Sequence, residues 1–124
     1  MNSKKILIID DDEAILEALK IYLEDLGYLV KTNPTAEKIL SKIEDFNPDL
    51  ILLDLLLADK DGLEVAKKIR VTKNIEKIPI LIMTAHPSIS KRAKEVNING
   101  YIEKPFDVNQ LVKVIEKFTE RDSL

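Results

Sequence analysis

Two short apolar runs in this chain end abruptly in aspartate, and this pattern narrows the possible folds more than any other feature. Residues 6–9 are Ile-Leu-Ile-Ile and lead into three aspartates at 10–12, and residues 50–53 are Leu-Ile-Leu-Leu and lead into Asp54. Continuous apolar runs of this length are typical of strands buried on both faces of a parallel sheet. In open α/β sheets, ligands bind just beyond the carboxyl ends of the strands. We therefore expect these acids at the chemically active edge of a sheet.

Length and composition favour one globular domain covering residues 1–124, with a core from about 4 to 120. The chain has 124 residues, of which 45% are hydrophobic, and its net charge is -3. A chain of this size buries roughly 65 to 70% of its unfolded surface. The weakly negative charge argues against direct nucleic-acid binding. The absence of cysteine excludes disulfides and zinc-thiolate sites, and the N-terminal apolar run is too short to cross a membrane. We expect a cytoplasmic protein.

Apolar residues at three- and four-residue spacing predict a helix after each apolar run. The first helix covers 13–26 and is followed by a glycine that stops it, and its apolar positions are Ala14, Ile15, Ala18, Leu19, Tyr22, Leu23 and Leu26. A second helix opens at 34–35 and carries Ala36, Ile39, Leu40 and Ile43 on one face. Further strands are predicted at 28–32, 50–54, 80–83 and 100–103, and further helices at 62–73, at 88–96 with Ser88 as N-cap, and at 107–120.

Strict alternation of strands and helices predicts a parallel sheet, because each parallel pair of strands needs a helical crossover. With five such units, the fold class is α/β, a flavodoxin-like (βα)5 doubly wound sandwich. Its five-stranded parallel sheet has the order 2-1-3-4-5, and the switch point lies between strands 1 and 3. Those are the two strands that end in aspartate.

This topology would bring Asp10, Asp11 and Asp54 together and predicts a metal site. Three carboxylates in close contact raise one another's pKa unless a cation neutralises them. Mg²⁺ prefers oxygen ligands and commonly uses one or two carboxylates together with phosphate oxygens. Asp12 is interpreted as the start of the first helix.

Two further polar residues end strands on the same predicted edge. Thr84 follows the fourth strand and Lys104 follows the fifth. A lysine ammonium can pair with phosphoryl oxygens, and a threonine hydroxyl can donate a hydrogen bond to them. Together with the acids, these residue types indicate a phosphoryl site.

With these motifs the chain resembles the receiver domain of two-component response regulators, including the single-domain receivers of chemotaxis. The resemblance covers essentially the whole chain. Its motifs are the first strand with its acids at 6–11, the phosphoacceptor strand at 48–54, the segment entering the third helix at 61–64, the strand ending in Thr-Ala at 79–85, and the lysine-proline motif at 100–106.

The resemblance implies a role for each site residue. Asp54 would accept a phosphoryl group from the phosphohistidine of a sensor histidine kinase or phosphotransfer protein. Mg²⁺, or Mn²⁺ in its place, would be ligated by Asp11, Asp54 and the main-chain carbonyl of Leu56. Asp10 would assist through water. Lys104 would pair with the phosphoryl group, next to a cis peptide bond to the following proline.

The resemblance also implies a signalling switch rather than an enzyme, with intrinsic phosphotransfer and slow autodephosphorylation. Thr84 would hydrogen-bond the phosphoryl group, and Tyr101 would then turn inward. The face made by helix 4, strand 5 and helix 5 would change shape and bind a downstream effector. We expect no direct binding to nucleic acid or membrane, and either a monomer or a phosphorylation-dependent dimer.

Three features depart from the family pattern. Ala58 stands where a proline is common. Leu56 and His86 occupy the two positions that tune hydrolysis of the phosphoryl group; Leu56 cannot orient a water, whereas His86 either orients one or is an exposed loop residue. The chain between Thr84 and Lys104 is about two residues short near 87–88, which affects the expected output face more than the phosphorylation site.

Two other functions remain as alternatives at this point. A haloacid-dehalogenase-like Mg²⁺-dependent phosphohydrolase would use Asp10 as nucleophile, but it would leave the Asp54 strand and the lysine-proline segment without a purpose. A docking domain that works without phosphorylation is disfavoured because the full set of acids is present. The sequence leaves open whether the chain is a stand-alone receiver or one domain of a longer regulator.

Overall fold

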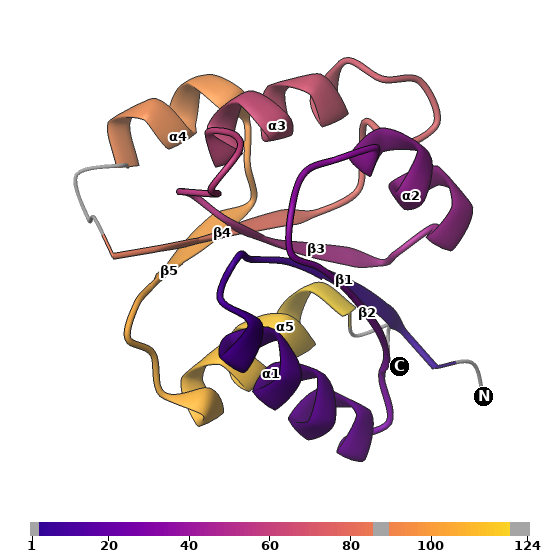
Figure 1. Ribbon diagram of the computed structural model, residues 1–124, viewed down its shortest axis with the longest axis vertical. Coiled ribbons are helices and arrows are strands. Elements are labelled where there is room, and N and C mark those ends of the chain that lie inside the picture. The colour runs from indigo at the N-terminus through magenta and orange to yellow at the C-terminus, as the bar shows by residue number, and fades with distance from the viewer. Residues whose placement is uncertain (1–2, 86–89, 120–124) are drawn as a thin grey trace.

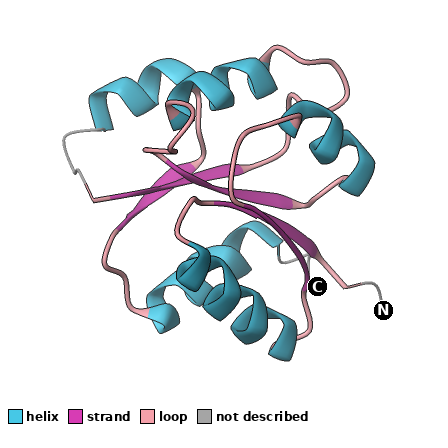
Figure 2. Cartoon of the chain, in the orientation of Figure 1, coloured by secondary structure: helices cyan, strands magenta, loops and turns pink. Residues whose placement is uncertain are grey.

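Strands and helices alternate along the chain in the computed structural model, which describes residues 3–85 and 90–119. The strands are β1 (Lys5–Ile9), β2 (Leu29–Asn33), β3 (Leu50–Asp54), β4 (Ile80–Thr84) and β5 (Gly100–Glu103). The helices are α1 (Glu13–Asp25), α2 (Ile39–Phe46), α3 (Gly62–Arg70), α4 (Ser90–Val96) and α5 (Val108–Thr119). Figure 2 shows this alternation, with the strands gathered in the middle of the molecule.

The five strands form one parallel sheet in the order β2-β1-β3-β4-β5, which confirms the predicted topology. Helices α1 and α5 cover one face, and α2, α3 and α4 cover the other (Figure 1). The fold is therefore the predicted flavodoxin-like doubly wound sandwich. Because all strands run in the same direction, the residues that follow them meet at one edge of the sheet.

Side chains of the inner strands alternate between two hydrophobic cores. In β1, Ile6 and Ile8 belong to the core under α1 and α5, whereas Leu7 and Ile9 belong to the core under α2 and α3. All residues of β3 and β4 are buried, as expected for strands covered by helices on both faces. Each fully buried leucine or isoleucine stabilises the fold by about 1.5–3 kcal/mol. The sheet is thus a firm base for the residues at its edge.

The buried face of α1 agrees only in part with the predicted one. Leu16, Leu19 and Leu23 are buried, whereas Ala14 and Ala18 are exposed and Tyr22 and Leu26 are largely exposed. Both sets recur at three- and four-residue spacing, so periodicity alone does not distinguish them. Leu19 and Leu23 were predicted and are buried, whereas Leu16 was not predicted and takes the buried position in place of Ala14, Ala18, Tyr22 and Leu26.

Helix α2 begins at Ile39 and not at 34–35, which corrects the prediction. Lys38 has a left-handed backbone (φ 54°), and this interrupts any helix that starts earlier. The turn before α2 is held by a residue from another segment, because the Asp59 carboxylate accepts a hydrogen bond from the Ala36 N–H at 3.3 Å. The predicted N-cap Ser88 lies outside the described residues. Other boundaries agree within three residues.

None of the helices in the described ranges is long and apolar enough to cross a membrane.

Candidate functional site

Backbone hydrogen bonds to neighbouring strands hold the first residues beyond the sheet edge in place. The N–H of Asp10, the first residue after β1, donates to the carbonyl of Asn33, the last residue of β2, at 3.1 Å. The N–H of Lys104, the first residue after β5, donates to the carbonyl of Thr84, the last residue of β4, at 2.7 Å. Asp54 is the last residue of β3, between them. The sheet therefore sets the spacing of these side chains.

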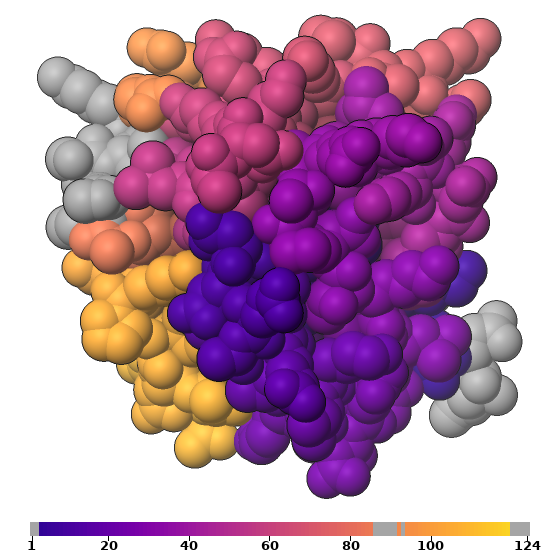
Figure 3. Space-filling view, viewed as in Figure 1, coloured from indigo at the N-terminus to yellow at the C-terminus, as the bar shows by residue number. Residues whose placement is uncertain are grey.

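The three predicted acids converge at this edge. Asp10, Asp11 and Asp54 each offer a carboxylate oxygen, and these oxygens lie within 4.8 Å of one another. Asp10 is completely buried, Asp54 is 6% exposed and Asp11 is exposed. Figure 3 shows the residues that follow β1 and the segment that follows β3 side by side on the molecular surface. The cluster is thus open to solvent on the side of Asp11.

Lys104 supplies the positive charge of the site. Its Nζ lies 2.8 Å from Asp10 Oδ2 and 3.4 Å from Asp54 Oδ1. Partial burial lowers the pKa of the ammonium, but the hydrogen bond and the charge of Asp10, together with Asp54, outweigh burial and raise the pKa overall. Lys104 therefore stays charged and bridges two of the three acids. The peptide bond from Lys104 to Pro105 is cis, as predicted.

The charge of the Lys104 ammonium does not balance the charges of the three carboxylates, and the pKa of Asp54 is raised. Burial is the largest cause that raises the pKa of Asp54, and the charges of Asp10 and Asp11 raise it further. The charge and hydrogen bond of Lys104 act in the opposite direction, but the pKa stays above its usual value. Bringing a cation close to Asp54 would relieve this repulsion.

The chain after β1 folds tightly around Asp10. Asp10 Oδ1 accepts a hydrogen bond from the Asp12 N–H at 2.9 Å, while its other oxygen faces Lys104. Asp12 then caps α1, because its Oδ1 accepts from the N–H groups of Ala14 and Ile15. This confirms that Asp12 starts the first helix. Both oxygens of Asp10 are engaged within the protein.

Gly62 is a site residue whose role the sequence analysis missed. It opens α3 and packs against the end of β3, where a Cβ atom would collide with the Asp54 carbonyl oxygen and lie 2.9 Å from Leu55 Cα. The Gly62 N–H donates to the Leu55 carbonyl at 2.6 Å. Only glycine fits this approach of backbone to backbone. The Asp-Gly pair at the start of a predicted helix was the available signal.

The other predicted residues lie around the acids or on the output face. Thr84 is buried at the end of β4, Leu56 is exposed just after Asp54, and Tyr101 on β5 is 45% exposed. His86 and the short region at 87–88 lie outside the described residues. Ala58 is exposed in the segment between β3 and α3. Their predicted roles stay predictions.

The donor set suits a hard divalent cation. Oxygen is the preferred ligand of Mg²⁺, and three carboxylates within reach of one point, two of them nearly dry, match its chemistry. Leu56 follows Asp54 closely, and its carbonyl belongs to the same segment. Asp11 and Asp54, with Leu56, could therefore hold such an ion.

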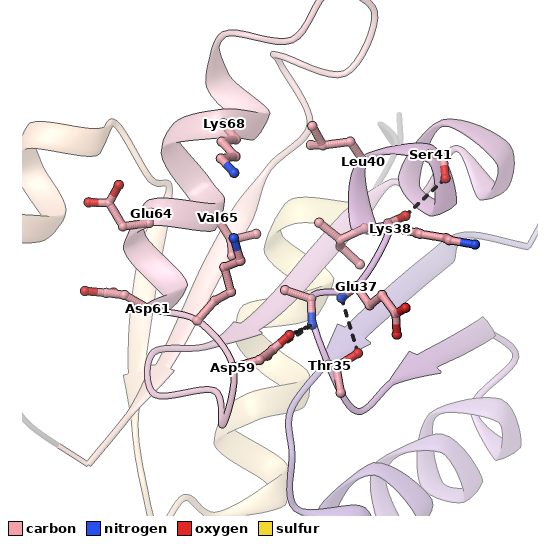
Figure 4. Close-up of a pocket in the computed structure, with 13 residues that line it drawn as sticks. Thr35, Glu37, Lys38, Leu40, Ser41, Asp59, Asp61, Glu64, Val65 and Lys68 are labelled. Atoms are coloured by element: carbon pink, nitrogen blue, oxygen red, sulfur yellow. Dashed lines mark hydrogen bonds between the residues drawn. The ribbon is translucent and has the colours of Figure 1, made fainter.

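A separate cavity of about 930 Å³ lies between α2 and α3 (Figure 4). Its floor is partly apolar, from Ile39, Leu40 and Val65, and Asp59 lines it from the segment after β3. The three clustered acids are not among its described lining residues. The candidate site is therefore the acid cluster and not this cavity.

Comparison with known proteins agrees with this geometry. The family model for the response regulator receiver domain matches residues 6–116. The alkaline phosphatase synthesis transcriptional regulatory protein PhoP of Bacillus subtilis is 40% identical over 95% of this chain and 50% of its own length. The chain thus spans about half the length of the curated relatives it matches.

Solved structures give the same result. The chemotaxis protein CheY4 of Vibrio cholerae superposes with a TM-score of 0.88 at 28% identity, covering 94% of this chain and 99% of that one. The receiver domain of a sensor histidine kinase from Pseudomonas aeruginosa, 24% identical with a TM-score of 0.85 over 97% of this chain and 100% of its own, shares the fold and is described with a magnesium ion in its active site cleft. The fold, the site geometry and the family match together show that this chain belongs to the response regulator receiver domain family.

Proposed function

We propose that this chain is a single receiver unit that accepts a phosphoryl group on Asp54 in a Mg²⁺-dependent reaction. The phosphoryl donor would be a phosphohistidine of a sensor histidine kinase or a phosphotransfer protein. A carboxylate oxygen of Asp54 attacks the phosphorus, the phosphorus–nitrogen bond breaks, and the released imidazole takes up a proton. Asp54 then carries an acyl phosphate.

The observation that supports this proposal is the placement of Lys104 beside the acid cluster. Its ammonium lies 3.4 Å from Asp54 Oδ1. It is therefore close enough to form a charge-assisted hydrogen bond with an oxygen of a phosphoryl group on that carboxylate. Phosphoryl transfer depends mainly on positioning and on charge neutralisation. When bound to Asp11, Asp54 and the Leu56 carbonyl, Mg²⁺ supplies the remaining positive charge.

The signal would leave the site through Thr84. This side chain is buried at the end of β4, next to β5, where Glu103 is its register partner. A hydrogen bond from the Thr84 hydroxyl to the new phosphoryl group would draw it toward Asp54. Tyr101, two residues earlier on β5 and 45% exposed, would then turn inward and change the surface of α4, β5 and α5 for an effector.

The haloacid-dehalogenase-like alternative has no support from the comparisons. It needs the Asp10 carboxylate as a free nucleophile. Asp10 is completely buried, and its oxygens are engaged by Lys104 and by the Asp12 N–H. Asp54 keeps the more accessible carboxylate of the two.

Intact-mass measurement after incubation with Mg²⁺ and acetyl phosphate tests the proposal. We expect one phosphoryl adduct on the wild type, none on Asp54→Asn, and none when EDTA removes the cation. Asp12→Asn is the matched control, since asparagine also caps helices and Asp12 lies outside the cluster. An adduct that persists in Asp54→Asn, or maps to Asp10, would contradict the proposal.

A further inference from the structure

The two ends of the segment between β3 and α3 pair with each other through their backbones. An isolated antiparallel bridge joins Leu56 to Asp61, and the Gly62 N–H donates to the Leu55 carbonyl at 2.6 Å. Asp61 is therefore the backbone partner of the residue whose carbonyl is the proposed cation ligand. A displacement of Asp61 would displace the Leu56 backbone with it.

Asp61 is held in turn by two hydrogen bonds from different helices. Its Oδ1 accepts from the Leu63 N–H at 2.9 Å and caps α3. Its Oδ2 accepts from the Arg92 guanidinium at 2.7 Å, across 31 positions of sequence. Figure 4 shows the Asp61 side chain turned away from the cavity between α2 and α3. Partial burial raises the pKa of Asp61, but the bond from Arg92 and the other contacts outweigh burial and lower it overall.

Arg92 lies on α4, the helix that packs beside α3. We infer that Arg92 is a positioning residue: by fixing Asp61 it holds the Leu56 carbonyl where a divalent cation can use it. This inference rests on the proposed function, because it assumes that a cation is bound at the acid cluster. It means that a residue on α4, which belongs to the predicted effector-binding face, helps to position a ligand of the proposed cation site.

Charge and positioning predict opposite effects when Arg92 is neutralised. Arg92 is a cation on the same molecule, so its removal by charge alone would strengthen the binding of Mg²⁺ slightly. If Arg92 acts by positioning, its removal loosens the Leu56–Asp61 pairing, and ordering that backbone weakens binding. The sign of the change in affinity therefore separates the two effects.

The test is Mg²⁺ titration of the purified chain by calorimetry at low ionic strength. We expect Arg92→Gln to weaken the affinity about two- to fivefold, in the range of a partly exposed ion pair, and Arg92→Lys to restore part of it. Lys94→Gln is the matched control, because Lys94 is exposed on the same helix and its loss reports the charge effect alone. In an Asp61→Asn background, which retains a capping oxygen, Arg92→Gln should weaken binding no further.

A second readout needs no cation. Hydrogen exchange of the Gly62 amide in EDTA should be faster in Arg92→Gln than in wild type or Lys94→Gln. Affinity that is unchanged or tighter in Arg92→Gln, equal weakening in both backgrounds, or unchanged Gly62 exchange would each overturn the inference. A wild-type chain that binds no Mg²⁺ would instead overturn the proposed function, so the two failures are distinguishable.

Discussion

Replacing Asp54 by asparagine should stabilise the metal-free fold, although it removes the proposed phosphoacceptor. Asp54 lies within 4.8 Å of carboxylate oxygens of Asp10 and Asp11, and the Lys104 ammonium lies 3.4 Å from it, the one ion-pair partner of Asp54 among the described residues. At an effective dielectric constant of about 20, unit charges repel by about 3.5 kcal/mol at the first distance and attract by about 5 kcal/mol at the second. Two repulsions therefore exceed one attraction by about 2 kcal/mol.

Solvent reduces this difference, because Asp11 is exposed and water and ions screen its repulsion of Asp54. We expect Asp54→Asn to raise the free energy of unfolding by about 1–2 kcal/mol in EDTA. For a domain of this size, that corresponds to an increase in Tm of about 4–8 °C. Thermal unfolding followed by circular dichroism at low salt measures it, with Asp12→Asn as control.

The same variant should respond differently to cation and to pH. Mg²⁺ at about 100 times its Kd should stabilise the wild type by about 2.7 kcal/mol, which exceeds the advantage of about 1–2 kcal/mol that Asp54→Asn has in EDTA. Because the variant lacks a charged ligand and gains little from the cation, the order of Tm should reverse. The folded pKa of Asp54 is raised, so its contribution is fully present below its unfolded value near 3.9 and is lost as pH rises through the folded pKa. The advantage of Asp54→Asn should therefore grow from pH 4 upward. A lower Tm for the variant in EDTA, or a difference that Mg²⁺ leaves unchanged, would refute the reasoning.

Three further predictions concern the support of the site. Gly62→Ala should destabilise the fold by about 1–3 kcal/mol in urea unfolding, because the Cβ meets backbone that cannot yield; unchanged stability would contradict the close approach. Asp12→Ala should cost about 1 kcal/mol through loss of the α1 cap, with Asp12→Asn nearly neutral in the same assay. Lys104→Met should cost about 3–5 kcal/mol at pH 7, because Asp10 is left buried and unpaired. The pKa of Lys104 is raised in the fold, so this loss should shrink only above the unfolded value near 10.4; a loss constant to pH 11 would argue against the pair.

The fold and the meeting of the acids could be predicted because both depend on continuous local patterns. A run such as 50–53 has apolar residues on both faces, so it must lie in the middle of a covered sheet. Because β1 and β3 are paired in parallel with Ile9 opposite Leu53, the next residues, Asp10 and Asp54, must be neighbours. Lys104 follows for the same reason, from the end of β5.

Features that depend on contacts between distant segments could not be predicted in this way. The start of α2 is set by a left-handed Lys38 and by a hydrogen bond from Ala36 to Asp59, 23 residues away. On α1, the spacing predicted the buried Leu19 and Leu23, but it did not show that packing on the sheet buries Leu16 rather than Tyr22 or Leu26. The Arg92–Asp61 pair joins two helices across 31 positions of sequence, and no spacing pattern in the sequence indicates such a contact.

The hydrogen bonds of Asp10 also bear on how the acids would share a cation. Both Asp10 oxygens are engaged, one by Lys104 at 2.8 Å and one by the Asp12 N–H at 2.9 Å. Direct ligation by Asp10 would compete with these bonds for the lone pairs of a fully buried carboxylate, where losing a hydrogen bond is costly. Asp11 faces solvent and keeps its oxygens available. In the proposed function, this asymmetry would favour direct ligation by Asp11 and Asp54, with Asp10 contributing its charge through water while it keeps Lys104 beside the proposed phosphoacceptor.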